Sequence, residues 1–215
     1  MLYHVDTVHE VILYNAMMVC RVRHEAGEAL GAIGTQECFA PLRGHQEDPC
    51  MEVAQTCQLA LQRIEFFQSP EGRSLIDNSP YMSVDPTPPA DASLGVEKLR
   101  ECLLDENEKI FDRYRAMFAL RNIGGEQAIE ALTTSFETST SALLKHEVAY
   151  VLGQMQDAGA VDRLQRVLEN GEENPMVRHE AAEALGSIGS PYCLDLLKKV
   201  STEMHLLYFV VIRSG

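Results

Sequence analysis

The 215-residue sequence lacks several signals that would place it in a common protein class. Its six cysteines are scattered and form no Cys-x-x-Cys pair, which argues against a disulfide framework or a zinc site and favours buried thiols in a reducing compartment. No apolar stretch approaches the length that crosses a bilayer, and the N-terminus has no basic start of the kind that opens a signal peptide. We therefore expect a cytoplasmic protein without a membrane partner.

Basic residues are also scarce. Lysine and arginine together number 18 against 32 acidic residues, which gives a formal net charge of −14. A nucleic-acid-binding protein needs a basic face, so nucleic acid is not an expected partner. The acidity suits a cationic partner or substrate, although it also serves simply to keep a surface soluble. No nucleophile motif or phosphate-binding loop is present, and Gly124-Gly125 is interpreted as a helix stop.

What the sequence does contain is a repeated phrase. The dipeptide His-Glu occurs three times in nearly the same helical context, at His24-Glu25, His146-Glu147 and His179-Glu180. His146 and His179 are 33 residues apart, Tyr114 precedes His146 by 32, and Gln55 follows His24 by 31. A period of about 32 residues is typical of a solenoid of helical pairs, whose apolar faces are buried only when neighbouring repeats stack.

These repeats predict an all-α, HEAT-like solenoid of helical pairs in two blocks. Apolar and small residues recur at helical spacing, and Gly34 and Gly189 stand where a helix should stop. Five of the nine prolines fall in residues 66–95, which we expect to be a non-helical linker. The expected organisation is an atypical N-terminal segment, a first repeat block, the linker, a second repeat block and an atypical tail, at residues 1–20, 21–65, 66–95, 96–200 and 201–215.

The His-Glu pairs predict a metal site. Imidazole and carboxylate together form a ligand set of non-haem iron. Stacked repeats place equivalent helices about 8–10 Å apart, so a His on one helix and a His-Glu pair on the next can face one ion. His146, His179 and Glu180 would complete a 2-His-1-carboxylate set within the second block. His24 and Glu25 have no equivalent His upstream at the repeat spacing.

Packing is the alternative explanation for the pairs. His-Glu could fill a polar ridge and pair with neighbouring basic side chains, but other repeats carry different dipeptides at the same place, so three copies favour metal binding. A fourth pair, His9-Glu10, stands in an unrelated context and is not expected to bind metal. Glu28 and Glu183 are interpreted as surface charges or as partners one helical turn from a His.

Longer strings in the chain resemble one family. Around the His-Glu pairs and in the linker the sequence contains the strings Ser141–Glu147, Leu152–Gln156, Asn174–Glu180 and Tyr81–Pro86. On these strings, residues 21–200 resemble the deoxyhypusine hydroxylases. The resemblance implies a di-iron monooxygenase that uses Fe²⁺ and dioxygen to convert deoxyhypusine, a modified lysine of a translation elongation factor, into hypusine. The implied partners are therefore that factor and dioxygen.

The resemblance also assigns residues. The family's second, third and fourth His-Glu pairs are matched, in order, by His24 and Glu25, His146 and Glu147, and His179 and Glu180. All six are expected at the metal site, with Glu147 facing the substrate amine, and no catalytic residue is expected beyond them. The family's first pair has no counterpart, and both ends depart from the family's pattern. We therefore expect a shortened chain with about one complete iron site and slow turnover.

Two other functions stay open at this point. A catalytically silent HEAT-like scaffold would bind a protein partner on its concave face. A bilin-lyase-like chaperone could be built on related repeats. Bound iron with an oxygen-dependent visible absorption would favour the hydroxylase, whereas a stable metal-free fold would favour a scaffold.

Overall fold

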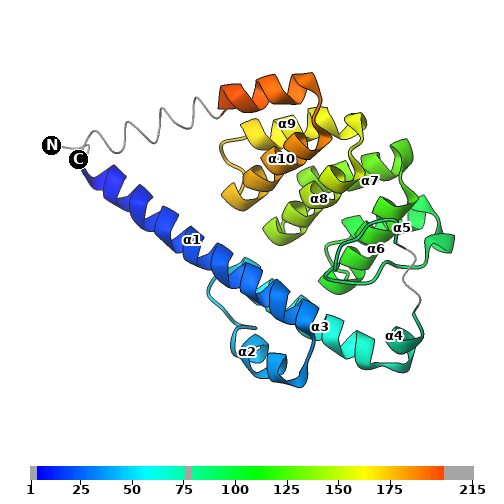
Figure 1. Ribbon diagram of the computed structural model, residues 1–215. Coiled ribbons are helices and arrows are strands. Elements are labelled where there is room, and N and C mark those ends of the chain that lie inside the picture. The colour runs from blue at the N-terminus through cyan, green and yellow to red at the C-terminus, as the bar shows by residue number, and fades with distance from the viewer. Residues whose placement is uncertain (1–3, 76–78, 201–215) are drawn as a thin grey trace.

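The structure, a computed structural model, describes residues 4–75 and 79–200, with the backbone alone for residues 4–18. Within these ranges every regular element is a helix (Figure 1). The prediction of an all-α, HEAT-like solenoid of helical pairs is confirmed. None of the described helices combines the length and the apolar character needed to cross a membrane. The tail expected at residues 201–215 lies outside the described residues.

The second block consists of stacked helical pairs. In each pair the second helix carries one repeat phrase, and α6, α8 and α10 pack side by side as one layer (Figure 1). Residues 191–200 are also helical. The elements of this block are η2 (Ala92–Leu94), α5 (Val96–Leu104), α6 (Ile110–Ile123), α7 (Gly125–Thr138), α8 (Ala142–Met155), η3 (Ala158–Ala160), α9 (Val161–Glu169) and α10 (Pro175–Ile188).

The first block is built around two long helices, α1 and α3, which pack on each other. Short helices on α3 complete a separate small core that includes Leu42, Val53 and Ile64. α1 carries the phrase with His24, and α3 carries Gln55-Thr56 at the equivalent place. The elements are α1 (His4–Ile33), η1 (Gln36–Cys38), α2 (Phe39–Gly44), α3 (Met51–Gln68) and α4 (Pro70–Ser74).

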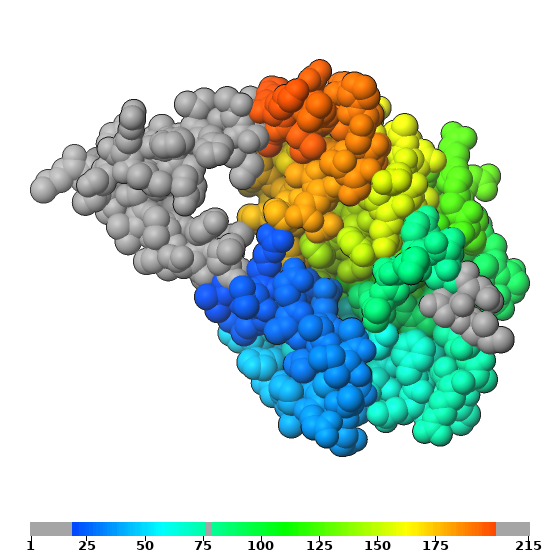
Figure 2. All heavy atoms as spheres, in the orientation of Figure 1, coloured from blue at the N-terminus to red at the C-terminus, as the bar shows by residue number. Residues whose placement is uncertain are grey.

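The two blocks are joined through α3. This helix packs on α6 and α8, and its residue Leu59 is buried in the core of the second block. Ser141 Oγ donates to Gln55 Oε1 at 3.0 Å, and Asn174 Nδ2 donates to Glu52 Oε1 at 2.8 Å. Figure 2 shows the blue atoms of the first block against the yellow and orange atoms of the second. The layer of α6, α8 and α10 therefore faces the first block.

Glycines at the end of the repeat phrase allow the inner helices to approach closely. A Cβ atom on Gly31 would lie 2.7 Å from Ala60 Cβ of α3, and one on Gly153 would lie 3.0 Å from Ala184 Cα of α10. Such distances are too short for a side chain, so the helix axes must separate if one is added. Gly34 and Gly189, with φ of +65° and +67°, end their helices as expected.

We expect Gly31→Ala to destabilise the protein. The added methyl group has no space against Ala60, so α1 and α3 must move apart, at a cost of about 1–3 kcal/mol in the free energy of unfolding. Urea unfolding followed by circular dichroism measures this change. Gly44→Ala at the end of α2 is the control, because a Cβ there meets nothing within 4 Å. Equal stability of the two variants would show that the close approach of α1 and α3 is not required.

The boundaries expected around the linker and the N-terminal segment were wrong in part. The position taken as the start of the linker, residue 66, lies inside α3, and Pro70 opens the short helix α4. Proline suits a first helical turn because no backbone N–H is needed there, and Ser69 caps that turn by accepting from Gly72 N at 3.1 Å. The boundary expected at residue 20 falls within α1, which is helical on both sides of it.

Candidate functional site

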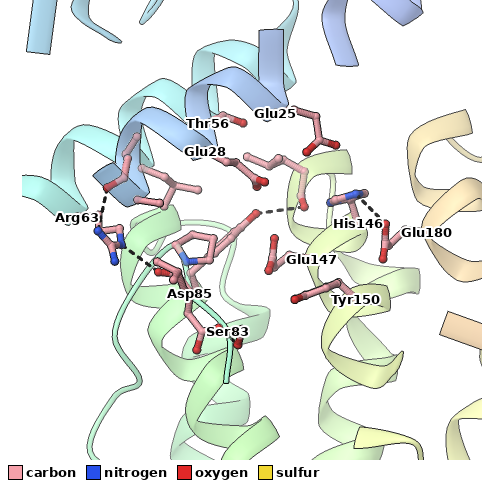
Figure 3. A pocket seen from close by; sticks show the side chains of 18 of the residues that line it. Glu25, Glu28, Thr56, Arg63, Ser83, Asp85, His146, Glu147, Tyr150 and Glu180 are labelled. Carbon is pink, nitrogen blue, oxygen red and sulfur yellow. Dashed lines mark hydrogen bonds and ion pairs between the residues drawn. The ribbon is translucent and has the colours of Figure 1, made fainter. Parts of the chain in front are cut away.

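A cavity of about 370 Å³ lies between the two blocks. α1 and α3 form one side of it, α6 and α8 form the other, and the segment 83–86 of the expected linker closes one edge (Figure 3). Its polar lining is mainly acidic. The charged and imidazole side chains that line it are Arg21, Glu25, Glu28, Arg63, Asp85, His146, Glu147, Glu180 and Glu183.

His24 is buried beside this cavity with its tautomer fixed. Its Nδ1 lies 2.7 Å from Thr56 Oγ1, and the Thr56 hydroxyl donates its hydrogen to the carbonyl oxygen of Glu52 at 2.7 Å. A hydroxyl has one hydrogen, so Thr56 accepts from His24 Nδ1–H and Nε2 carries the free lone pair. That Nε2 is buried without a hydrogen-bond partner, 3.6 Å from Glu28 Oε1. Burial lowers the pKa of His24 to about 3, with smaller contributions from His146 and Arg21, so the ring is neutral.

His146 reaches the same place from the other block. Its ring lies edge-to-face against His24, with 5.4 Å between ring centroids. Its Nε2 lies 3.2 Å from Glu180 Oε2, and its Nδ1 is buried without a hydrogen-bond partner. The cluster therefore contains one imidazole from each block, His24 on α1 and His146 on α8, and the carboxylate of Glu180 on α10.

His179 points elsewhere. Its Nε2 lies 2.8 Å from a guanidinium nitrogen of Arg21 and 2.7 Å from Glu183 Oε1, and its side chain is 41% exposed. Glu25 is also largely exposed, with Oε1 3.9 Å from Arg21 Nε. Two of the six residues assigned to the metal site thus lie outside the buried cluster, and Arg21 contacts both of them.

The remaining carboxylates have little to neutralise them. Burial raises the pKa of Glu147 well above its usual range, and the nearby carboxylates Glu28, Asp85 and Glu180 raise it further, while Arg121 lowers it. Burial likewise raises the pKa of Glu28 to about 7. Figure 3 shows Glu28 from α1 and Glu147 from α8 directed toward the same space. A cation that enters the cavity would favour the ionised forms of both carboxylates.

One wall of the cavity is held by a buried arginine. Arg121 on α6 donates to both carboxylate oxygens of Asp85, at 3.0 and 2.6 Å, and its side chain is fully buried. It also donates to Gln154 Oε1 at 2.7 Å and stacks on Tyr81, 4.5 Å from the ring centroid. From the other block, Arg63 donates to the Asp85 carbonyl oxygen at 3.0 Å. The segment that was expected to be a linker is thus fixed to both blocks as part of the site.

The structure groups the assigned residues differently from the sequence prediction. His146 and Glu180 meet as expected, but the imidazole beside them is His24 and not His179. Among the described residues, no three His, Cys, Asp or Glu side chains converge closely enough to hold one ion as they stand. Glu28, interpreted as a surface charge or a partner of His24, lines the cavity.

Several site residues were missed by the sequence reasoning. Arg121 and Arg63 have no motif, and Thr56 and Tyr114 stand at repeat positions that lack His-Glu. Tyr114 lines the cavity and donates to the carbonyl oxygen of Leu143 at 3.1 Å. The repeat alignment could have identified Thr56 and Tyr114, because they stand at the positions that His-Glu occupies in the other repeats.

Comparison with known proteins places this chain in a family. HEAT repeats match residues 129–204, and the PBS lyase HEAT-like repeat matches residues 22–48 and 112–138. The chain is also similar to a solved structure of human deoxyhypusine hydroxylase in complex with glycerol, with a TM-score of 0.79 and 48% sequence identity over 91% of this chain and 69% of that chain. The chain belongs to the deoxyhypusine hydroxylase family.

Curated deoxyhypusine hydroxylases agree with this assignment. The protein of Rattus norvegicus is 53% identical over 182 residues, which cover 85% of this chain and 59% of the rat protein. The protein of Homo sapiens is 55% identical over 177 residues, covering 82% of this chain and 57% of the human protein. The chain therefore spans about six tenths of the length of these curated relatives.

The residues present fit iron in their donor chemistry. The two imidazoles are buried, each has one nitrogen without a hydrogen-bond partner, and for His24 that nitrogen is the unprotonated one. The carboxylates of Glu28 and Glu180 lie beside these imidazoles, 3.6 Å from His24 Nε2 and 3.2 Å from His146 Nε2. Imidazole nitrogen and carboxylate oxygen are donors that ferrous iron accepts, and a His whose other nitrogen donates to a fixed acceptor is the usual form of a metal ligand.

Proposed function

We propose that this chain is a deoxyhypusine hydroxylase, which adds one oxygen atom to the deoxyhypusine side chain of a translation elongation factor with ferrous iron and dioxygen. The family assignment supports the reaction. The observation that carries the proposal for this chain is the buried, unprotonated Nε2 of His24 beside His146 and Glu180, at the edge of an acidic cavity.

Different residues are assigned to iron binding, to orientation of a ligand and to the cavity wall. His24 and His146 would hold iron from the two blocks, with Glu180 beside His146 and with Glu25 and His179 available after side-chain rotation. Iron, when bound, would supply the activation of dioxygen, which protein side chains alone do not provide. Thr56 fixes the His24 ring in the ligating tautomer, and Tyr114 and Leu143 close the cavity behind it.

The cavity suits an extended cationic side chain. Deoxyhypusine carries amines that are protonated at neutral pH, and an ammonium group entering the cavity would stabilise the ionised forms of Glu28 and Glu147. Asp85 is not available for this role because both of its oxygens are engaged by Arg121. The net charge of −14 would favour the approach of a basic protein surface.

The test of this function is a single-product assay. The purified full chain is incubated aerobically with ferrous iron, a reductant and the deoxyhypusine-bearing factor, and the factor is analysed by mass spectrometry. The expected result is a gain of one oxygen atom on the modified lysine, incorporated from labelled dioxygen. Bound iron without this product over many hours would contradict the proposed reaction.

Glu147→Gln is expected to weaken substrate binding about tenfold, because a charge-assisted hydrogen bond to the substrate amine is replaced by a neutral one. Iron content should stay close to that of the wild type, since no contact of Glu147 with His24 or His146 is required in this account. Titration of the factor followed by fluorescence anisotropy measures the first quantity, and elemental analysis measures the second. Loss of iron in this variant would make Glu147 a ligand.

A metal-free scaffold is the second candidate. It is favoured by one observation, namely that no three ligand side chains converge as they stand among the described residues. A scaffold of this kind would bind the factor on the acidic face without retaining iron after desalting. Elemental analysis of the protein used in the assay above separates the two candidates.

A further inference from the structure

Arg21 breaks the internal repeat at the site. In the phrase around His179 the residue three positions before the histidine is Met176, and in the phrase around His146 it is Leu143. The equivalent position before His24 is Arg21, so a charge replaces an apolar side chain. Packing within the repeat therefore does not require this arginine.

The structure shows what the guanidinium does instead. Arg21 Nη2 lies 2.8 Å from His179 Nε2, and Arg21 Nε lies 3.9 Å from Glu25 Oε1, so one side chain on α1 engages one residue from each block. Glu183 Oε1 lies 2.7 Å from the same His179 nitrogen. One nitrogen cannot both accept from Arg21 and donate to Glu183. Either the Nε2 lone pair accepts an N–H of Arg21, or Nε2 carries its own hydrogen and donates it to Glu183, and a metal ion at Nε2 would have to displace that hydrogen bond.

Arg21 also carries a permanent positive charge to the rim of the cavity. Its side chain is 37% exposed, so it can leave His179 and Glu25 by rotating into solvent without breaking the core. Arg21 also helps to lower the pKa of His24, but among the described residues no side chain donates a hydrogen bond to His24 Nε2 or His146 Nδ1. Direct contact with Arg21 is thus limited to the two exposed residues of the assigned ligand set, His179 and Glu25.

We propose that Arg21 is a competing cation, which occupies His179 and Glu25 and thereby weakens the binding of a divalent metal to this chain. This inference rests on the proposed function, because it takes the His-Glu pairs as metal-binding residues. It accounts for the separation of His179 and Glu25 from the buried cluster. It also predicts that the site binds metal more tightly when position 21 carries an apolar residue, as in the other two His-Glu phrases.

The test is the affinity of the full chain for ferrous iron alone, measured by isothermal titration calorimetry without oxygen. Arg21→Met, which copies Met176, is expected to bind iron about tenfold more tightly than the wild type, because a guanidinium no longer repels the ion or competes for its ligands. Arg21→Lys keeps the charge and should stay close to the wild type. Arg166→Met removes one exposed arginine of α9 and controls for the change in net charge.

The outcomes separate this inference from the proposed function. Equal iron affinity of Arg21→Met and the wild type, with iron bound by both, would overturn the role of Arg21 and leave the metal site in place. An equal gain in Arg166→Met would assign the effect to net charge and also overturn it. Absence of iron from all variants would overturn both the inference and the proposed metal site.

Discussion

Arg121→Met is expected to lower the free energy of unfolding by about 3–5 kcal/mol, the usual cost of removing one partner of a buried ion pair. The variant leaves the Asp85 carboxylate without its guanidinium partner, and this is costly because the Asp85 side chain is only 10% exposed and water cannot replace the lost partner. It also removes the donor to Gln154 and the cation that stacks on Tyr81 and Phe118. Chemical denaturation with urea, followed by circular dichroism, measures the loss.

A matched variant tests the burial argument. Arg100→Met removes an arginine whose side chain is 39% exposed and pairs with Glu97 at 3.4 Å, and a surface pair of this kind contributes about 0–1 kcal/mol. A second variant, Arg121→Met with Asp85→Leu, removes both buried charges and should recover part of the stability. A loss in Arg121→Met no larger than that in Arg100→Met would show that the segment around Asp85 is not fixed by this pair.

Thr56→Val is expected to weaken iron binding by about 10–100-fold, the usual effect of removing the partner that orients a ligating histidine. Valine keeps the shape of threonine, including the methyl group that would lie 3.0 Å from a Cβ atom at Gly27, so the packing of α1 on α3 is not expected to change. Without the hydroxyl, His24 Nδ1–H has no acceptor, and the tautomer with the free lone pair on Nε2 loses its advantage. Anaerobic calorimetry with ferrous iron measures the affinity.

Thr133→Val is the matched control for this change. Thr133 is buried on α7, and its hydroxyl donates to the carbonyl oxygen of Glu130 within the same helix, as Thr56 does to Glu52. The control therefore loses the same kind of intrahelical bond away from the cavity. Similar iron affinity for both variants would mean that the Thr56 hydroxyl does not set the state of His24.

The repeat pattern was sufficient to predict the fold and the position of each His-Glu pair along its helix. The spacing between His146 and His179 could be predicted because it depends only on the length of one helical pair. The helix stops at Gly34 and Gly189 were also predictable, since glycine, which has no Cβ, adopts a positive φ more readily than other residues. These features follow from rules that act within one repeat.

Contacts between the blocks could not be predicted in the same way. His24 meets His146, and Arg121 meets Asp85 across 36 residues, because α3 packs against α6 and α8 and the segment 83–86 lies across the cavity. The repeat period in the sequence carries no information about how the two blocks pack on each other. The expectation that His146, His179 and Glu180 form a complete ligand set assumed that only repeats next to each other in the sequence lie next to each other in space.

The most direct test of a site shared by both blocks is the iron content of His24→Ala, measured by elemental analysis after anaerobic loading and desalting. His24 belongs to the first block, so this variant keeps His146, His179 and Glu180 unchanged. His45→Ala, which removes an exposed histidine paired with Asp48, is the control. The account predicts that His24→Ala loses its iron while His45→Ala retains the wild-type content. Wild-type iron content in His24→Ala would contradict the shared site and show that the second block holds the metal alone.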